Sequence, residues 1–259
     1  MTSGKRLRAS GLLVPGLFTL VGLAILVSLG LWQLDRLSWK EDLIARAEAR
    51  SQAPARDIPD AEDWPALDLP ALEYQAVRLS GRFDHDAELH VYTALSSPRG
   101  AHGGPGWWVM TPMALDGGGT VLVNRGFVPE RFKSPASRPE GQVDGRVEIE
   151  GLLRLTEPQG PFIPDDEPDN NVWFTRDPGR MAAALGLDEP VAPFFVDARH
   201  AAPGGLPQGG ETTLTFRNDH LGYAITWFGL AATLLGVFGF WAYGRLAGEP
   251  GRGVGSAHP

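Results

Sequence analysis

Two long apolar runs without a charged residue dominate the chain, one near each end. The first covers residues 11–34 and the second covers residues 221–243. As helices they would each reach roughly 35 Å, more than the hydrocarbon core of a bilayer, which is about 30 Å thick. Each run therefore predicts a transmembrane helix. The first is longer than the apolar region of a signal peptide and lacks a small-x-small cleavage site, so we expect it to be retained.

The pattern between these runs changes from helical to strand-like. Apolar positions keep a helical spacing to about Arg50, so the first helix should continue past the membrane. Residues 51–70 are rich in Pro, Ala and Asp and predict a linker or irregular loop. Short runs rich in Val, Leu and aromatic residues, bounded by Gly, Pro, Asp or Ser, then predict strands. They cover residues 74–83, 88–95, 106–115, 119–129, 145–155 and 191–199.

Together these elements predict a membrane protein with two transmembrane α-helices flanking a β-rich domain, an antiparallel sheet or small barrel of the α+β class. The sequence DGGGT should form the turn of a hairpin, and residues 177–187 should form one short helix. The predicted divisions are a tail at 1–10, a span at 11–34, a domain at 35–220, a span at 221–243 and a tail at 244–259.

Charge bears on orientation and on the class of partner. Basic residues flank the first span on both sides, whereas Arg245 after the second span favours a cytoplasmic C-terminus. We therefore expect both tails in the cytoplasm and the domain outside it. That domain holds 18 Lys and Arg against 30 Asp and Glu. Its acidity argues against nucleic acid as a partner. The lipid bilayer is expected to surround the two spans.

Residue types and motifs argue against an enzyme. The chain has no cysteine, which excludes disulfides, thiolate metal sites and cysteine nucleophiles. It also lacks a phosphate-binding glycine loop, a GxSxG motif and an HExxH motif. The stretch FDHDAELH, residues 83–90, carries five side chains with metal-ligand chemistry, but an acidic turn followed by a strand is the favoured interpretation.

The strongest candidate site lies where the two spans should meet at the outer surface. In an up-and-down pair, the end of the first span lies level with the start of the second. His220, Tyr223, Ala224 and Trp227 fall on one face of a helix. The residues brought to this level are Trp32, Gln33, Arg36, Arg217, Asn218, His220, Tyr223 and Trp227.

Such a slot has the chemistry to hold an amphipathic macrocycle. An imidazole can ligate haem iron, aromatic rings can cover a porphyrin, and arginines at the water edge can pair with propionates. On the residues alone, however, an interfacial anchor in which His220 and the aromatic side chains simply lie at headgroup depth is favoured. Gly229 and Gly236, with Gly222 at the same seven-residue interval, suggest either a packing face against the first span or one for a partner.

Five motifs occur in an order that resembles the surfeit locus protein 1 family. They are LGLWQLDRLSWK, GPGWWVMTPM, VLVNRGFVP, NNVWFTRD and NDHLGYAITWFG. Members of this family assist the biogenesis of haem-copper cytochrome oxidases, and bacterial members bind haem a, with a histidine at the start of the second span implicated. By motif, that histidine corresponds to His220. The VNRG motif, Asn124, Arg125 and Gly126, is either a partner contact or a strand end that needs glycine.

The resemblance implies a function. The chain would be an assembly factor for an aa3-type cytochrome c oxidase that binds haem a as cargo, with His220 as the axial ligand of the iron. Trp32, Tyr223 and Trp227 would flank the ring, and Arg36 or Arg217 would meet the propionates. Its partners would be the haem-bearing oxidase subunit and haem a synthase, and its location the bacterial inner (plasma) membrane, with the domain in the periplasm. The alternative is a membrane scaffold that stabilises an assembly intermediate without binding haem.

Overall fold

The computed structural model describes residues 11–157, 159–212 and 218–247. These residues belong to two units. One is helical and lies within residues 1–44 and 216–259, and the other is β-rich and covers Ala45–Thr215. Arg217, one of the predicted site residues, lies outside the described residues.

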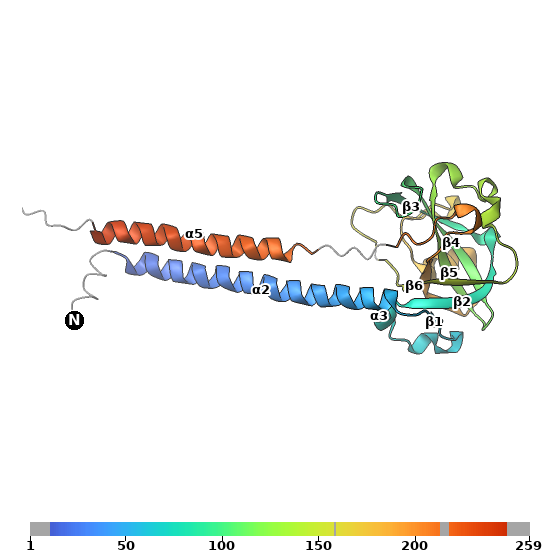
Figure 1. Cartoon of the computed structure of the whole chain (residues 1–259), viewed down its shortest axis with the longest axis horizontal. Coiled ribbons are helices and arrows are strands. Elements are labelled where there is room, and N and C mark those ends of the chain that lie inside the picture. Colours follow the sequence, from blue (N-terminus) through green and yellow to red (C-terminus); the bar gives the residue numbers. More distant parts are fainter. Residues whose placement is uncertain (1–10, 158, 213–217, 248–259) are drawn as a thin grey trace, which may run out of the picture. The chain divides into compact units, whose positions relative to one another are not determined.

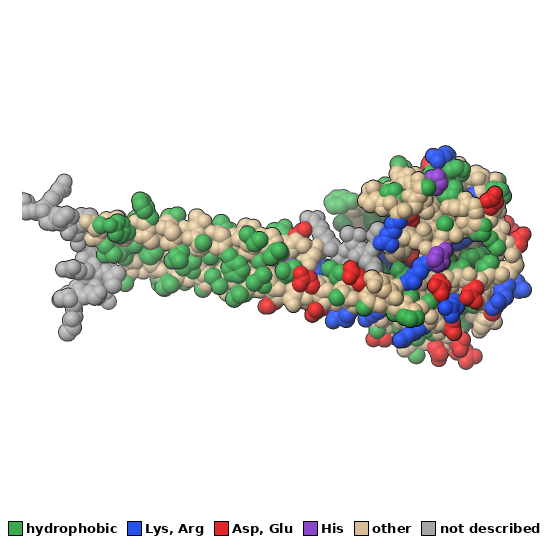
Figure 2. All heavy atoms as spheres, viewed as in Figure 1, with side chains coloured by type: hydrophobic (Ala, Val, Ile, Leu, Met, Phe, Trp, Pro, Cys, Tyr) green, Lys and Arg blue, Asp and Glu red, His purple; other side chains and the backbone are tan. Residues whose placement is uncertain are grey.

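Two long helices, α2 (Leu13–Gln52) and α5 (His220–Ala247), run side by side in the helical unit (Figure 1). They contain 40 and 28 residues, so they measure roughly 60 Å and 42 Å. Both are long and apolar enough to cross a membrane, and hydrophobic side chains cover most of their visible surface (Figure 2). The continuation of the first helix beyond the apolar run to about Arg50 is confirmed.

The β-rich unit is built from seven strands with two short α-helices and several single turns of 3-10 helix. The strands are β1 (Arg56–Asp57), β2 (Ala76–Phe83), β3 (Leu89–Leu95), β4 (Gly104–Leu115), β5 (Thr120–Pro129), β6 (Val147–Arg154) and β7 (Val191–Ala198). The α-helices are α3 (Leu69–Leu72) and α4 (Pro178–Leu185). The 3-10 helices cover Ala61–Ala66, His85–Ala87, Glu130–Phe132, Pro135–Ser137, Pro139–Gly141, Pro168–Asn170 and Pro203–Gly205.

Five of these strands close into a barrel. The strand order is β1-β2-β6-β7-β5-β4-β3, and β2 also pairs with β4. Gly81 in β2 is the corner at which the barrel closes, because it pairs with Val147 of β6 on one side and with Leu115 of β4 on the other. The predicted small barrel and the hairpin between β4 and β5 are therefore confirmed. The sheet is not purely antiparallel, however, since β5 pairs with β7 in parallel.

Alternate residues of all five barrel strands fill the barrel interior. This first core cluster contains Val77, Leu79, Met113, Val121, Val123, Leu153, Ala192, Phe194 and Val196. A second cluster on the outer face of the barrel packs Trp173 and Met181 against β3, β4, β5 and β7. The inward pattern follows from the two-residue period of a strand, which sends every second side chain to the same side.

Residues 51–70, predicted to be a linker or irregular loop, are packed onto the barrel. Trp64 is only 3% exposed, and its indole Nε1 donates a hydrogen bond of 2.9 Å to the Pro59 carbonyl. The ring stands edge-on to Phe194, with 5.8 Å between centroids. Of the two alternatives, the linker is wrong, because Pro and Asp mark a break in regular structure equally well in a loose linker and in a packed turn. The NNVWFTRD motif forms no strand of its own, and its residues Val172 and Trp173 make only isolated bridges.

Candidate functional site

The first candidate site is the end of the helix pair at which α5 begins. His220 is the first residue of α5, and its Nδ1 lies 2.7 Å from Oε1 of Gln33 on α2. An amide oxygen carries no proton, so Nδ1 of His220 must be the protonated nitrogen that donates this bond. In the neutral ring the lone pair then resides on Nε2, which makes no hydrogen bond within the described residues. Gln33 is 8% exposed, so the bond is shielded from competing water.

Glycines on α2 allow the two helices to approach. The Cβ of an alanine at Gly30 would lie 2.6 Å from the ring of Phe228, and one at Gly22 would lie 3.0 Å from Leu234. Gly16 faces Phe238 in the same way, at 3.5 Å. As the number on α2 rises, the number of its partner on α5 falls, so the helices are antiparallel, as predicted. Bulky side chains of α5 thus enter gaps left by glycines of α2.

The predicted glycine face of α5 does not pack against the first span. A Cβ added at Gly229 or Gly236 would meet no other atom within 4 Å. The residues of α5 that are buried are instead Ala224 and Ala231, which are 1% and 7% exposed. Of the two alternatives for Gly229 and Gly236, packing against the first span is therefore wrong, and contact with a partner stays a prediction.

Among the described residues, no hydrogen bond or ring contact joins the other predicted residues of this site to His220. Trp32 and Tyr223 are about half exposed, at 52% and 55%, and Trp227 is half-buried. The guanidinium of Arg36 stacks over the ring of Trp39, 4.8 Å from its centroid, rather than over Trp32. Among the described residues, the structure joins only Gln33 directly to His220.

Asn218 lies two residues before His220 and carries an unused acceptor. Its Oδ1 is buried and accepts no hydrogen bond from the described part of the chain. A buried acceptor without a donor costs about 1–3 kcal/mol. A partner or ligand that donates a hydrogen bond here would recover that cost, so the prediction that Asn218 takes part in a contact stays open.

The VNRG motif has a structural role. The side chain of Asn124 donates a hydrogen bond of 2.7 Å to Asp197 of β7 and accepts one of 3.1 Å from the backbone of Gly126. Gly126 has φ +128°, and a Cβ there would collide with the Gln208 carbonyl. Asn124 and Arg125 are each 4% exposed. Of the two sequence alternatives, these contacts support the structural one, because side chains so deeply buried leave little area for contact with a protein partner.

A buried ionic cluster gathers around Glu88. Oε1 of Glu88 accepts hydrogen bonds from Arg138 and from Nε2 of His90, the latter at 2.8 Å, and Oε2 lies 3.7 Å from Arg125. Burial alone would raise the pKa of Glu88, but the bonds from His90 and Arg138 outweigh it and keep the pKa below its ordinary value. These contacts use part of FDHDAELH, and no group of three or more metal-ligating side chains occurs among the described residues.

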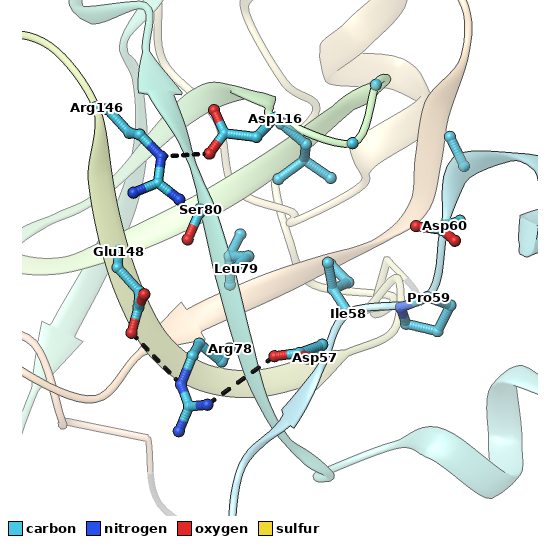
Figure 3. Close-up of a pocket in the computed structure, with 14 residues that line it drawn as sticks. Asp57, Ile58, Pro59, Asp60, Arg78, Leu79, Ser80, Asp116, Arg146 and Glu148 are labelled. Carbon is cyan, nitrogen blue, oxygen red and sulfur yellow. Dashed lines mark hydrogen bonds and ion pairs between the residues drawn. The ribbon is translucent and has the colours of Figure 1, made fainter.

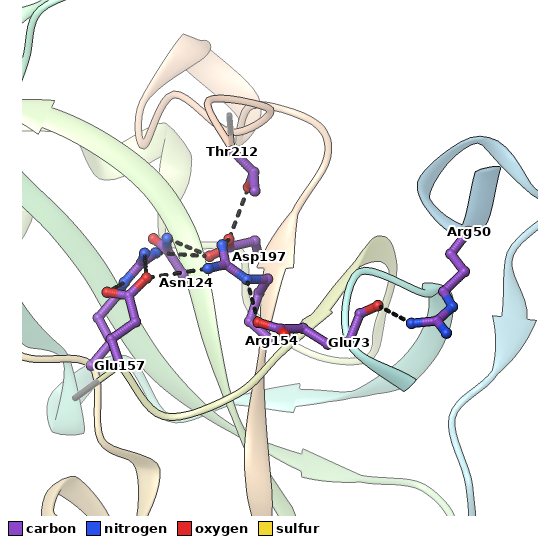
Figure 4. A network of polar contacts seen from close by, with 8 residues as sticks. Arg50, Glu73, Asn124, Arg154, Glu157, Asp197 and Thr212 are labelled. Carbon is purple, nitrogen blue, oxygen red and sulfur yellow. Dashed lines mark hydrogen bonds and ion pairs between the residues drawn. The ribbon is translucent and has the colours of Figure 1, made fainter. Parts of the chain in front are cut away.

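A second buried network is centred on Asp197 (Figure 4). Its carboxylate accepts hydrogen bonds from Asn124, Arg154, Arg176 and Thr212. Burial alone would lower the pKa of Arg176, yet Asp197 and Glu157 hold it above its ordinary value. The network joins β5, β6 and β7 to Thr212 in the segment that follows β7.

Sequence reasoning missed both networks. Their members come from separate strands and loops, so no local spacing reveals them. The usable indication was the placement of single charged residues in otherwise apolar strand runs, such as Arg125 after VLVN, Arg154 after GLL and Asp197 after FFV. A charge in such a run is rarely buried without a partner.

A surface pocket beside β2 carries only exposed ion pairs (Figure 3). Its volume is about 360 Å³. Arg78 lies 3.5 Å from Glu148 and 4.0 Å from Asp57, and Arg146 pairs with Asp116. Ion pairs so exposed to water contribute little to stability.

Comparison with known proteins places most of the chain in one group of relatives. A model of the SURF1 family matches residues 20–232. Surfeit locus protein 1 of Rattus norvegicus is 42% identical over 216 residues, covering 79% of this chain and 68% of the relative. The Homo sapiens protein of the same name is 39% identical over 236 residues, covering 86% and 75%. A SURF1-like protein of Monosiga brevicollis is 37% identical over 243 residues, covering 89% and 87%.

Proposed function

Because the chain belongs to the SURF1 family, we propose that it is an assembly factor for a haem-copper cytochrome c oxidase that carries haem a. The protein would hold haem a through His220 at the outer surface of the membrane and pass it to the haem-bearing oxidase subunit. It is not an enzyme in this proposal, since haem a is cargo and no bond in it is made or broken. Haem a synthase is the proposed donor.

The observation that carries this proposal is the hydrogen bond between Gln33 and His220. This bond favours the tautomer of His220 that carries the proton on Nδ1. The lone pair of the neutral ring is then on Nε2, the nitrogen that can bind iron. A ligating histidine usually donates its other N–H to an oxygen that fixes its orientation and makes it a better ligand. An anchor at headgroup depth requires no such bond.

The residues around His220 fit a haem in their chemistry. Trp32 and Tyr223 leave much of their aromatic surface exposed, and Trp227 is half-buried. Arg36 is exposed and bears a charge that can pair with a propionate. Arg217 is proposed for the same role from the sequence. When bound, the haem supplies the iron and the macrocycle, and this chain supplies an oriented imidazole, aromatic surface and cationic groups.

The location we propose is the bacterial inner membrane, with the β-rich unit in the periplasm. The apolar part of α2 ends near Gln33 and that of α5 begins after His220, so this end of the helix pair would lie at one surface of the bilayer. The orientation rests on Arg245 after the second span and on the length of the segment between the spans.

The test is the visible spectrum of protein purified from cells that make haem a. The wild type should contain haem a, and His220→Ala should lose most of it. Tyr243→Ala, at the other end of α5, is a matched control because Tyr243 is 72% exposed and far along the helix from His220. Equal haem content and an identical spectrum in His220→Ala would sink the ligand assignment.

A scaffold that binds no haem is the second candidate. It is favoured by the open face of α5 at Gly229 and Gly236, which is suited to close contact with a helix of a partner. Oxidase assembly that survives His220→Ala but fails with Gly229→Leu would select the scaffold over the haem carrier.

A further inference from the structure

The barrel has an apolar pocket at one end that no step of haem transfer uses. Its volume is about 460 Å³, within the roughly 300–1,000 Å³ typical of small-molecule sites. Its apolar walls come from β2, β6 and β7 and from the loop that follows β7. They are Phe83, Val143, Val147, Ile149, Ala198 and Ala202.

These walls continue the barrel interior. Phe83, Val147 and Ile149 pack against the first core cluster, yet each is only half-buried. Residues further along the same strand faces, such as Leu79 and Leu153, are 2% and 1% exposed. The apolar surface of the barrel interior therefore stays uncovered at this end. Mouths of β-barrels are common ligand sites, because they offer a hydrophobic lining that is already formed.

One cation forms part of the pocket wall. Arg125 follows Val121 and Val123 on the inward side of β5, and its guanidinium lies 5.0 Å from the ring of Phe83. It donates to the Gly141 carbonyl and lies 3.2 Å from Nδ1 of His85. A guanidinium has five N–H donors, so these contacts leave Arg125 with unused donors.

The charge behind the pocket is not balanced. Arg125 and Arg138 share a single carboxylate, that of Glu88, and Glu88 bonds directly to Arg138 while its nearest oxygen is 3.7 Å from Arg125. Burial lowers the pKa of Arg125 to about 10 despite the attraction of Glu88, and the neighbouring charge of Arg138 lowers it further. Two acidic residues, Glu148 and Glu150, also line the pocket, and both pair with Arg78.

We propose that the barrel mouth binds a small amphipathic carboxylate, with its apolar body against Phe83, Val147 and Ile149 and its carboxylate directed to Arg125. The carboxylate would compensate the surplus positive charge of the Glu88 cluster. The apolar body would cover the half-buried walls. A cationic amphiphile would place its charge beside an uncompensated guanidinium, so it should bind poorly.

The test measures binding of radiolabelled octanoate to the full chain in detergent by equilibrium dialysis, against a detergent blank. Wild type should show saturable binding, with octylamine and octanol at least about tenfold weaker. Ala201→Trp should lower octanoate affinity at least about tenfold, because Ala201 lines the pocket from an exposed loop position and tolerates a large side chain. Ala101→Trp, on an exposed loop outside this pocket, should leave the affinity unchanged.

Arg125→Lys and Arg125→Gln then test the charge, with circular dichroism as the check that each variant folds. Lysine should retain part of the octanoate affinity and glutamine should lose it. Non-saturable uptake, equal affinity for octanoate and octylamine, or octanoate binding that persists in Ala201→Trp would each overturn the proposal. Octanol binding as tightly as octanoate would overturn the role of Arg125.

Discussion

Nδ1 of His220 and Oε1 of Gln33 are 2.7 Å apart, across the antiparallel pair of α2 and α5. The bond links two residues that are 187 positions apart in the sequence, and it selects one tautomer of the imidazole. The tautomer of the His220 ring therefore depends on how the two membrane helices pack.

Replacing Gln33 by leucine removes the acceptor with little change in volume. We expect Gln33→Leu to release Nδ1, so that ¹⁵N chemical shifts of His220 change from the Nδ1–H tautomer to a mixture without any haem present. Haem a affinity should fall about 10–100-fold, as is usual when the group that orients a ligand is lost. Thr19→Val is the control, because Thr19 is a second buried polar residue of α2 that bonds only to its own helix. Unchanged shifts in Gln33→Leu would contradict the tautomer assignment.

Helix pairing should depend on Gly30 and not on Gly229. A side chain at Gly30 would meet the ring of Phe228 at 2.6 Å, whereas one at Gly229 would meet nothing within 4 Å. The chain has no cysteine, so Gly22→Cys with Leu234→Cys provides a clean cross-link between α2 and α5. Gly30→Leu should reduce the yield of this cross-link, and Gly229→Leu should not. Equal yields in the two variants would argue against this packing.

Gly126 should tolerate no side chain. It has φ +128°, and a Cβ would collide with the Gln208 carbonyl, so we expect Gly126→Ala to cost at least about 2–3 kcal/mol of unfolding free energy. Gly145 also has positive φ, +82°, but open space around it, so Gly145→Ala should cost only about 1 kcal/mol. Urea unfolding followed by tryptophan fluorescence measures both. A similar loss in the two variants would show that strain alone, without the collision, accounts for the effect.

Glu88 should make the β-rich unit sensitive to acid. Its pKa is lower in the folded protein than in the unfolded chain, where it is about 4.3, so its contribution is present above that pH. As the pH falls through the folded pKa the contribution is lost. Glu88→Gln leaves two buried guanidiniums without a counter-charge and should cost about 3–5 kcal/mol near neutral pH.

The difference between wild type and Glu88→Gln should therefore shrink as the pH drops below about 4. Urea midpoints measured from pH 7 down to pH 3 test this. Asp144→Asn is the control, since Asp144 is exposed and should change stability by less than about 0.5 kcal/mol. A difference that does not vary with pH would show that Glu88 acts through packing and not through its charge.

The sequence predicted the elements of the fold better than their arrangement. The sequence runs predicted β2 to β7 and both long helices, but not the short strand β1, because periodicity and turn residues are local properties. The parallel pairing of β7 with β5 was not, since a crossover that carries residues 130–190 has no local pattern. The burial of Trp64 was not predicted for the same reason, because its partner Phe194 lies 130 residues away in the sequence.

The candidate site shows a similar division. Helix spacing and the antiparallel pair placed Gln33 opposite His220 correctly, because apolar run ends mark the same depth. The seven-residue glycine interval defines one face of α5, but nothing in one helix tells which of its faces packs against a neighbouring helix. Phe228 and Leu234 determine which face of α5 packs against α2, because these bulky side chains lie opposite glycines of α2.

The position of β7 means that the barrel can close only after this strand has been synthesised. It is the last strand among the described residues, yet it lies between β6 and β5 in the sheet. Until residues 191–198 have been synthesised, two strand edges stay open, and open edges can pair with other chains. A chain that ends before Val191 therefore lacks β7, and without β7 its other strands cannot close into a barrel. Such truncated products should aggregate or be removed by proteolysis.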